Sequence, residues 1–164
     1  MTKDASNDVV SGCRAKAANL PLFVYGTLIF PEVVRALLGA LPEATPAVAN
    51  GFSARTLSGR IYPGLLKEEG ESAKGVLYQG LDSQMMEVLD RFEGEEYTLS
   101  IISVQCGEEE VDALVYLLSA PFAHLINKER WDLMAFKRDH LSRYVELCKE
   151  AGSMSAAELT CDDH

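Results

Sequence analysis

The chain has 164 residues, of which 48% are hydrophobic, and 25 acidic against 15 basic residues give it a net charge of −10. This length fits one domain, and this apolar content can bury a core without disulfides or metal. A surface of such negative charge repels nucleic-acid phosphates and anionic membranes, so we expect no nucleic acid and no membrane as a partner.

The cysteines and the N-terminus indicate a cytoplasmic protein without metal. The four cysteines lie far apart in the sequence: Cys13, Cys106, Cys148 and Cys161. There is no C-x-x-C pair, no pair of histidines at helical spacing, no P-loop and no G-x-G-x-x-G, so we expect reduced thiols, no metal and no cofactor. No apolar run approaches the ~20 residues of a membrane span. Asp4 and Asp8, together with the lack of an apolar leader, argue against a targeting peptide.

Both ends of the chain differ in composition from the middle. Residues 1–19 and the tail 151–164 are small and polar, without hydrophobic periodicity. Such segments cannot bury enough apolar surface to fold, so we expect both to be disordered. The folded domain is then expected over residues 20–150.

The first half of the chain predicts a strand, a helix and several more strands. Leu22–Tyr25 is a β-branched and aromatic run typical of a buried strand. A helix follows from Pro31, which suits a first helical turn, to Gly39, which suits a helix end. Residues 45–62 suggest two short strands, the second at Arg60–Tyr62. The run Lys67–Glu71 predicts a charged turn, and Gly75–Tyr78 a further strand.

The second half predicts a helix, a hairpin and a final helix. Asp82 or Ser83 can cap a helix over 84–92, and Gly94 would end it. Tyr97–Cys106 and Val111–Leu118 predict strands joined by an acidic turn. A last helix over about 129–149 would share one apolar stripe, made by Met134, Leu141, Val145 and Cys148. This order indicates an α+β domain with a largely antiparallel sheet.

One candidate site is Tyr25-Gly26-Thr27-Leu28, where the first strand turns toward the first helix. Glycine lets a ligand approach the main chain, and free N–H groups beside a helix start can bind an anion. The same pattern also suits a plain strand-to-helix turn.

The other candidate is Glu93, which follows Phe92 at the end of an amphipathic helix and precedes a glycine. If its carboxyl points inward, apolar neighbours would raise its pKa and make it an acid/base near neutral pH. A glutamate among 25 acids can equally be a solvated surface charge.

The two segments together resemble the gamma-glutamylcyclotransferase-like superfamily. They are Phe23–Leu28 and Leu89–Tyr97, in this order and at this separation, and they look most like the branch of the plant avirulence-induced gene products. Gly59–Pro63 also matches that branch, and Trp131 opens a C-terminal helix as in its plant members. The similarity runs from about Leu22 to Leu147.

The resemblance implies a small mixed β-barrel flanked by helices. It maps the family's catalytic glutamate onto Glu93 and a substrate-binding main-chain loop onto this chain. The implied substrate-binding residues are Val24, Tyr25, Gly26, Thr27, Leu28 and Ile29, with Tyr62 and Tyr97 as further pocket candidates. Thr27 replaces the commoner serine, and Leu99 stands where many relatives carry arginine.

The activity implied is that of a γ-glutamylcyclotransferase, a cofactor-independent acyl transfer that releases 5-oxoproline from a small γ-glutamyl substrate. Glutathione, γ-glutamyl amino acids and γ-glutamyl amines are all open as substrates, and the oligomeric state is open too. The alternative is a non-catalytic ligand-binding or stress-response interaction module of the same fold, because fold does not dictate function.

Overall fold

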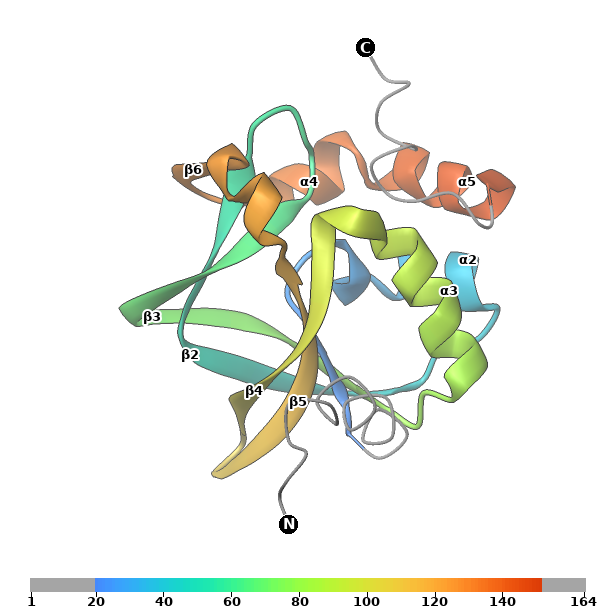
Figure 1. Ribbon diagram of the computed structural model, residues 1–164. Coiled ribbons are helices and arrows are strands. Elements are labelled where there is room, and N and C mark those ends of the chain that lie inside the picture. The colour runs from blue at the N-terminus through green and yellow to red at the C-terminus, as the bar shows by residue number, and fades with distance from the viewer. Residues whose placement is uncertain (1–19, 152–164) are drawn as a thin grey trace.

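A closed five-stranded β-barrel forms the centre of the computed structural model, which describes residues 20–151 (Figure 1). Around the barrel the strand order is β3, β1, β5, β4, β2, and β2 pairs again with β3. The strands are β1 (Leu22–Val24), β2 (Glu43–Leu57), β3 (Pro63–Gln79), β4 (Tyr97–Cys106), β5 (Glu109–Leu118) and β6 (Ile126–Arg130), the last pairing with β2. In this part of the chain only the β1–β5 pairing is parallel, which confirms the α+β class with a largely antiparallel sheet. The two ends predicted to be disordered lie outside the described residues, apart from Ala151, which is the last residue of helix α5 (Leu141–Ala151).

The central strands are buried on both faces. In β5, Ala113 and Val115 point into the barrel, while Leu114 and Tyr116 pack outward under the helices. In β1, Phe23 points inward and its two neighbours point outward. Side chains alternate along a strand, so a strand covered on both faces needs an uninterrupted apolar run. This explains the continuous apolar sequence of β1.

Helices α2 (Pro31–Leu38), α3 (Ser83–Glu93) and α5 (Leu141–Ala151) lie on one side of the barrel in Figure 1. The predicted boundaries of the first two are confirmed. Gly39 ends α2 with a left-handed φ of 76°. The Asp82 side chain caps α3 by accepting a hydrogen bond from the backbone N–H of Met85 at 2.8 Å.

Two predictions between β2 and β3 were wrong. Arg60–Tyr62 forms no strand but lies in the connection between Leu57 and Pro63. The acidic run Lys67–Glu71 belongs to β3 rather than to a turn. The register jumps from Asn50 opposite Ser72 to Phe52 opposite Lys67, so residues 68–71 face the single residue Gly51. The extra charged residues therefore form a bulge in β3 where it pairs with β2.

The predicted last helix was also wrong in part. Residues 126–130 form β6, and the helix breaks at His140 into α4 (Leu133–Asp139) and α5. The break changes the helical phase, so Met134 is 63% exposed and Phe136 is buried instead. Trp131 precedes α4, whose N-cap is Asp132.

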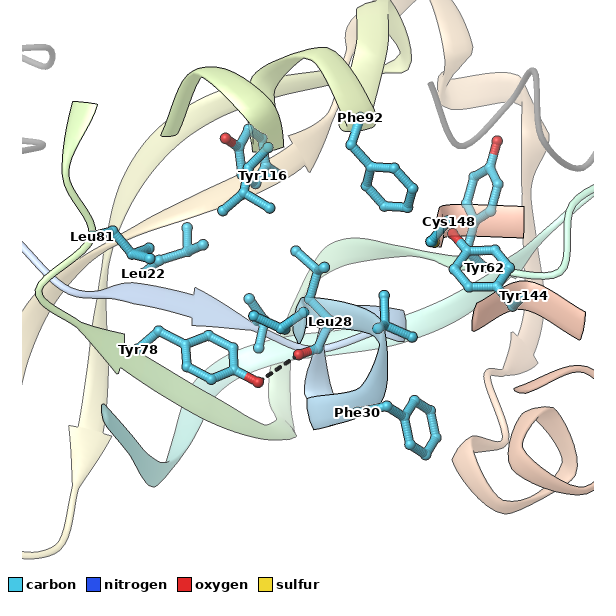
Figure 2. Close-up of a cluster of buried hydrophobic side chains, with 14 of the residues drawn as sticks. Leu22, Leu28, Phe30, Tyr62, Tyr78, Leu81, Phe92, Tyr116, Tyr144 and Cys148 are labelled. Atoms are coloured by element: carbon cyan, nitrogen blue, oxygen red, sulfur yellow. Dashed lines mark hydrogen bonds between the residues drawn. The ribbon is translucent and has the colours of Figure 1, made fainter. Parts of the chain in front are cut away.

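A cluster of buried side chains fixes the segment that follows β1. Figure 2 shows the hydroxyl of Tyr78, on β3, donating a hydrogen bond to the backbone carbonyl of Leu28 at 2.8 Å. Phe92 of α3 packs in the same cluster. The barrel therefore holds the end of β1 and the end of α3 in one rigid unit.

Gly75 is expected to be essential for stability. A Cβ atom there would lie 2.1 Å from the carbonyl oxygen of Val24 and 2.8 Å from the ring of Phe23. Gly75→Ala should therefore lower the free energy of unfolding by about 3 kcal/mol, measured by urea denaturation. The matched control is Gly80→Ala, where a Cβ meets nothing within 4 Å and only the φ of +74° opposes it, at about 1 kcal/mol. Equal losses in the two variants would contradict the close packing of β1 on β3.

Candidate active site

The loop after β1 is a tight turn, with the 3₁₀ helix η1 at Thr27–Ile29. The N–H groups of Ile29 and Phe30 donate to the carbonyls of Gly26 and Thr27, at 3.0 and 3.2 Å. The N–H groups that open a helical turn have no partner inside that turn. A Cβ on Gly26 would lie 2.9 Å from two ring carbons of Pro63, so the main chain here packs directly against the first residue of β3.

Glu93 is the last residue of α3, where Gly94 adopts a φ of 71° and turns the chain into the 3₁₀ helix η2 (Gly94–Glu96). The Glu93 side chain lines a pocket that contains about 410 Å³ of unoccupied space. The loop after β1 lines the same pocket. Two segments about 65 residues apart in sequence therefore meet at one cavity.

The structure brings together eight of the nine residues assigned to the site. Those lining the pocket are Val24, Tyr25, Gly26, Thr27, Leu28, Tyr62, Glu93 and Tyr97. Ile29 does not line it and instead lines a second, open pocket that also contains Trp131.

The environment of Glu93 favours its protonated form. Burial, followed by the charges of Asp90 and Glu96, raises the pKa of the Glu93 carboxyl from the ordinary 4.5 to about 8. Within the described residues, neither a hydrogen bond nor a cation offsets these effects. The carboxyl can thus take up or release a proton close to neutral pH, which suits a general acid/base.

Two further tyrosines line the pocket that no sequence motif indicated, Tyr116 of β5 and Tyr144 of α5. Tyr25 donates its hydroxyl proton to the backbone carbonyl of Tyr116 at 2.5 Å, and Thr27 donates to the Tyr144 hydroxyl at 3.5 Å. Alternation along β5 and helical spacing in α5 indicate burial of both residues. Neither pattern says which cavity a buried side chain reaches, so no local signal could have found them.

The tyrosine side chains of the pocket are uncharged, because their hydroxyl groups keep their protons. Tyr97 donates its hydroxyl proton to the backbone carbonyl of Pro63 at 2.5 Å, and Tyr62 donates to the Glu96 carboxylate at 2.8 Å. Burial raises the pKa values of Tyr25 and Tyr97 well above 10, and the charge of Glu93 adds to the effect. These phenols therefore stay protonated at neutral pH.

Residues 20–151 contain no group of three or more histidine, cysteine, aspartate or glutamate side chains placed to hold a metal ion. In the same residues no helix has the length and apolarity needed to cross a membrane. Two cysteines, Cys106 and Cys148, are described, and both are free thiols. Burial raises the pKa of Cys148 to about 12, so its reactive thiolate form is scarce.

The chain is similar in sequence to plant proteins over most of its length. AIG2-like protein D of Arabidopsis thaliana is 26% identical over 132 residues, which cover 79% of this chain and 86% of the relative. AIG2-like protein B of the same plant is 29% identical over 137 residues, covering 79% of this chain and 76% of the relative.

Solved structures share the fold. The solution structure of an Arabidopsis thaliana protein aligns with a TM-score of 0.60 and 27% identity, over 80% of this chain and 89% of that one. A structure named gamma-glutamyl cyclotransferase aligns with a TM-score of 0.52 over 87% of this chain and 98% of that one. At 16% identity this second match shows the fold alone.

The family described as "Gamma-glutamyl cyclotransferase, AIG2-like" matches residues 22–133, which include the loop after β1, Glu93 and β4. Because this match spans more than half of the 164 residues, the chain belongs to the gamma-glutamyl cyclotransferase, AIG2-like family.

Proposed function

We propose that this protein is a γ-glutamylcyclotransferase that converts a small γ-glutamyl compound into 5-oxoproline and a free amine or amino acid. The observation that carries the proposal is the Glu93 carboxyl, which lines the same pocket as a main-chain loop and has a pKa of about 8. Family membership and the shared fold support the same reaction. Cytoplasmic location, inferred from composition, is part of this proposal.

The proposed reaction needs one proton carrier. The α-amino group of the substrate attacks its own γ-carbonyl carbon, a C–N bond forms, and the original amide C–N bond breaks. An α-amino group has a pKa of about 8 and is largely protonated at pH 7. This ammonium group loses one proton to water before it attacks; the Glu93 carboxylate then takes a second proton from the attacking nitrogen and returns it to the departing nitrogen, so no other reactant is consumed. Ring closure is intramolecular, so holding the substrate folded lowers much of the barrier.

The loop from Tyr25 to Leu28 is the proposed holder of the substrate. Its opening N–H groups would donate hydrogen bonds to the substrate carboxylate or to the oxyanion that develops at the γ-carbonyl. One well-aimed donor of this kind contributes roughly 3–4 kcal/mol to the transition state. The close contact of Gly26 with Pro63 keeps this main chain at a fixed position on the pocket wall.

One observation favours the alternative of a non-catalytic binding module. Leu99, at the position where many relatives carry arginine, lies in β4 opposite Tyr116 and packs against the hydrophobic core. No charge reaches the site from this position. Incubation with glutathione, γ-glutamyl amino acids and γ-glutamyl amines, followed by measurement of 5-oxoproline, separates the two functions. Binding of a panel member without turnover would favour the binding module.

The pH dependence of turnover is expected to follow Glu93. Below pH 8 its carboxyl holds a proton and cannot accept one from the substrate amine. We therefore expect the ratio of kcat/KM in the wild type to that in Glu93→Gln to rise about tenfold per pH unit below pH 8 and to level off above it. The substrate amine titrates in the same pH range. The residual activity of Glu93→Gln is therefore the control, because its pH dependence comes only from ionisation of the substrate. Identical pH profiles for the two proteins would contradict Glu93 as the base.

A further inference from the structure

Glu96 is a buried carboxylate three residues after Glu93, and it is only 5% exposed. Its Oε2 atom accepts hydrogen bonds from Nη2 of Arg60 at 2.6 Å and from Nε at 3.1 Å. Its Oε1 atom accepts the hydroxyl proton of Tyr62 at 2.8 Å. The backbone carbonyl of Glu96 also accepts a hydrogen bond from Ser119 at 2.7 Å, which fixes η2 against the end of β5.

The pairing with Glu96 neutralises the charge of Arg60, which lies beside the pocket. No lysine, arginine or histidine lines the pocket within residues 20–151, and Arg60 belongs to the connection that carries Tyr62 to the pocket wall. A cation in contact with Glu93 would stabilise the ionised carboxylate and lower its pKa. Because Arg60 binds Glu96 through two nitrogens, its charge is already compensated.

The same contacts orient Tyr62. Its hydroxyl proton goes to Glu96, so toward the pocket the oxygen can only accept a hydrogen bond. Its ring lies 6.2 Å from the ring of Tyr97, another pocket residue.

We propose that Glu96 is a positioning residue of the site: by binding both Arg60 and the Tyr62 hydroxyl, it keeps Glu93 without a cationic partner and fixes one wall of the pocket. The proposal rests on the proposed acid/base role of Glu93. The other titratable groups around Glu93 are Asp90 of its own helix, whose charge raises the pKa of Glu93, and three phenols whose pKa values the charge of Glu93 raises: Tyr25 after β1, Tyr97 of β4 and Tyr144 of α5. None of these is a cation; Arg60, which Glu96 binds two residues before the pocket residue Tyr62, is the cation whose release the proposal puts to the test.

The test is a direct pH titration of Glu93 by NMR on protein with ¹³C-labelled glutamate, assigned with Glu93→Gln. Glu96→Gln removes the carboxylate charge and frees Arg60, so the Glu93 midpoint should fall by about one pH unit or more from about 8. The matched control is Glu95→Gln, which removes the same charge from an exposed neighbour in η2 and should shift the midpoint by less than about 0.3 units. An unchanged midpoint in Glu96→Gln would overturn the proposal, since a purely structural role would lower only the Tm.

A double variant separates the two effects of Glu96. Arg60→Gln/Glu96→Gln has no cation to release, so its midpoint should fall less than that of Glu96→Gln. Equal shifts would overturn the claim that Glu96 sequesters Arg60. If the single variant does not fold because it buries an unpaired cation, the double variant still tests the proposal, as neutral replacements of buried ion pairs are usually tolerated. A midpoint that falls by about one pH unit or more in the double variant would then overturn it, because this variant has no cation to release.

The titration does not depend on turnover. Failure of the cyclotransferase function would appear as absent 5-oxoproline release with the Glu93 shifts intact. Failure of the positioning role would appear as intact release with no shift of the Glu93 midpoint.

Discussion

Glu93→Gln is expected to lower 5-oxoproline release by about 10²-fold or more, the usual contribution of a general acid–base group. Glutamine keeps the size and shape of glutamate but cannot accept a proton from the substrate amine. Binding of the γ-glutamyl compound should persist, because the loop after β1 rather than the carboxyl is proposed to hold it. Turnover is measured by 5-oxoproline release and binding by calorimetry.

Glu95→Gln is the matched control, since this neighbouring glutamate is exposed and should retain full activity. Full activity in Glu93→Gln would contradict the assignment of the acid/base. Loss of binding together with turnover would instead point to a holding role for the carboxyl.

The same variant should also change the pH dependence of stability. The folded-state pKa of Glu93, about 8, lies above the ordinary 4.5, so the folded protein binds this proton more tightly than the unfolded chain does. The stability that the neutral carboxyl contributes is complete below pH 4.5 and is lost as the pH rises through 8. The Tm of Glu93→Gln relative to the wild type should therefore increase between pH 5 and pH 9.

Gly26→Val is expected to abolish ligand binding. Its Cβ would lie 2.9 Å from the Cγ and Cδ atoms of Pro63, so either the loop or the start of β3 must move. Main-chain donors aimed at a ligand lose most of their effect when displaced by about 1 Å. Binding of 5-oxoproline, the proposed product, is measured by calorimetry and thermal shift.

Gly59→Val is the control, because a Cβ there meets nothing within 4 Å and the strain of its positive φ falls on an exposed residue. Wild-type affinity in Gly26→Val would rule out this loop as the binding element. If the valine variant does not fold, Gly26→Ala makes the smaller change at the same atom and should weaken binding by at least about tenfold.

Local signals in the sequence were sufficient for several elements. The apolar run of β1, Pro31 and Gly39 of α2, and the cap at Asp82 each act within a few residues, so short patterns specify them. The hairpin of β4 and β5 was predicted for the same reason. The prediction of one long last helix was wrong because the 3.6-residue hydrophobic period continues in the sequence across His140, where the chain breaks into α4 and α5 and no local pattern marks the break.

The sequence by itself determined that this chain is an α+β protein with Glu93 at the end of a helix, and its motifs pointed to one family. The resemblance to that family already implied a β-barrel, which the structure confirms. Only the tertiary structure decided the order of the strands around the barrel, the contribution of Tyr116 and Tyr144 to the pocket, and the pairing of Arg60 with Glu96. These features depend on contacts between residues far apart in the chain. Helical and strand periodicity reports which face of an element is buried, and only the packing of the elements decides what that face meets.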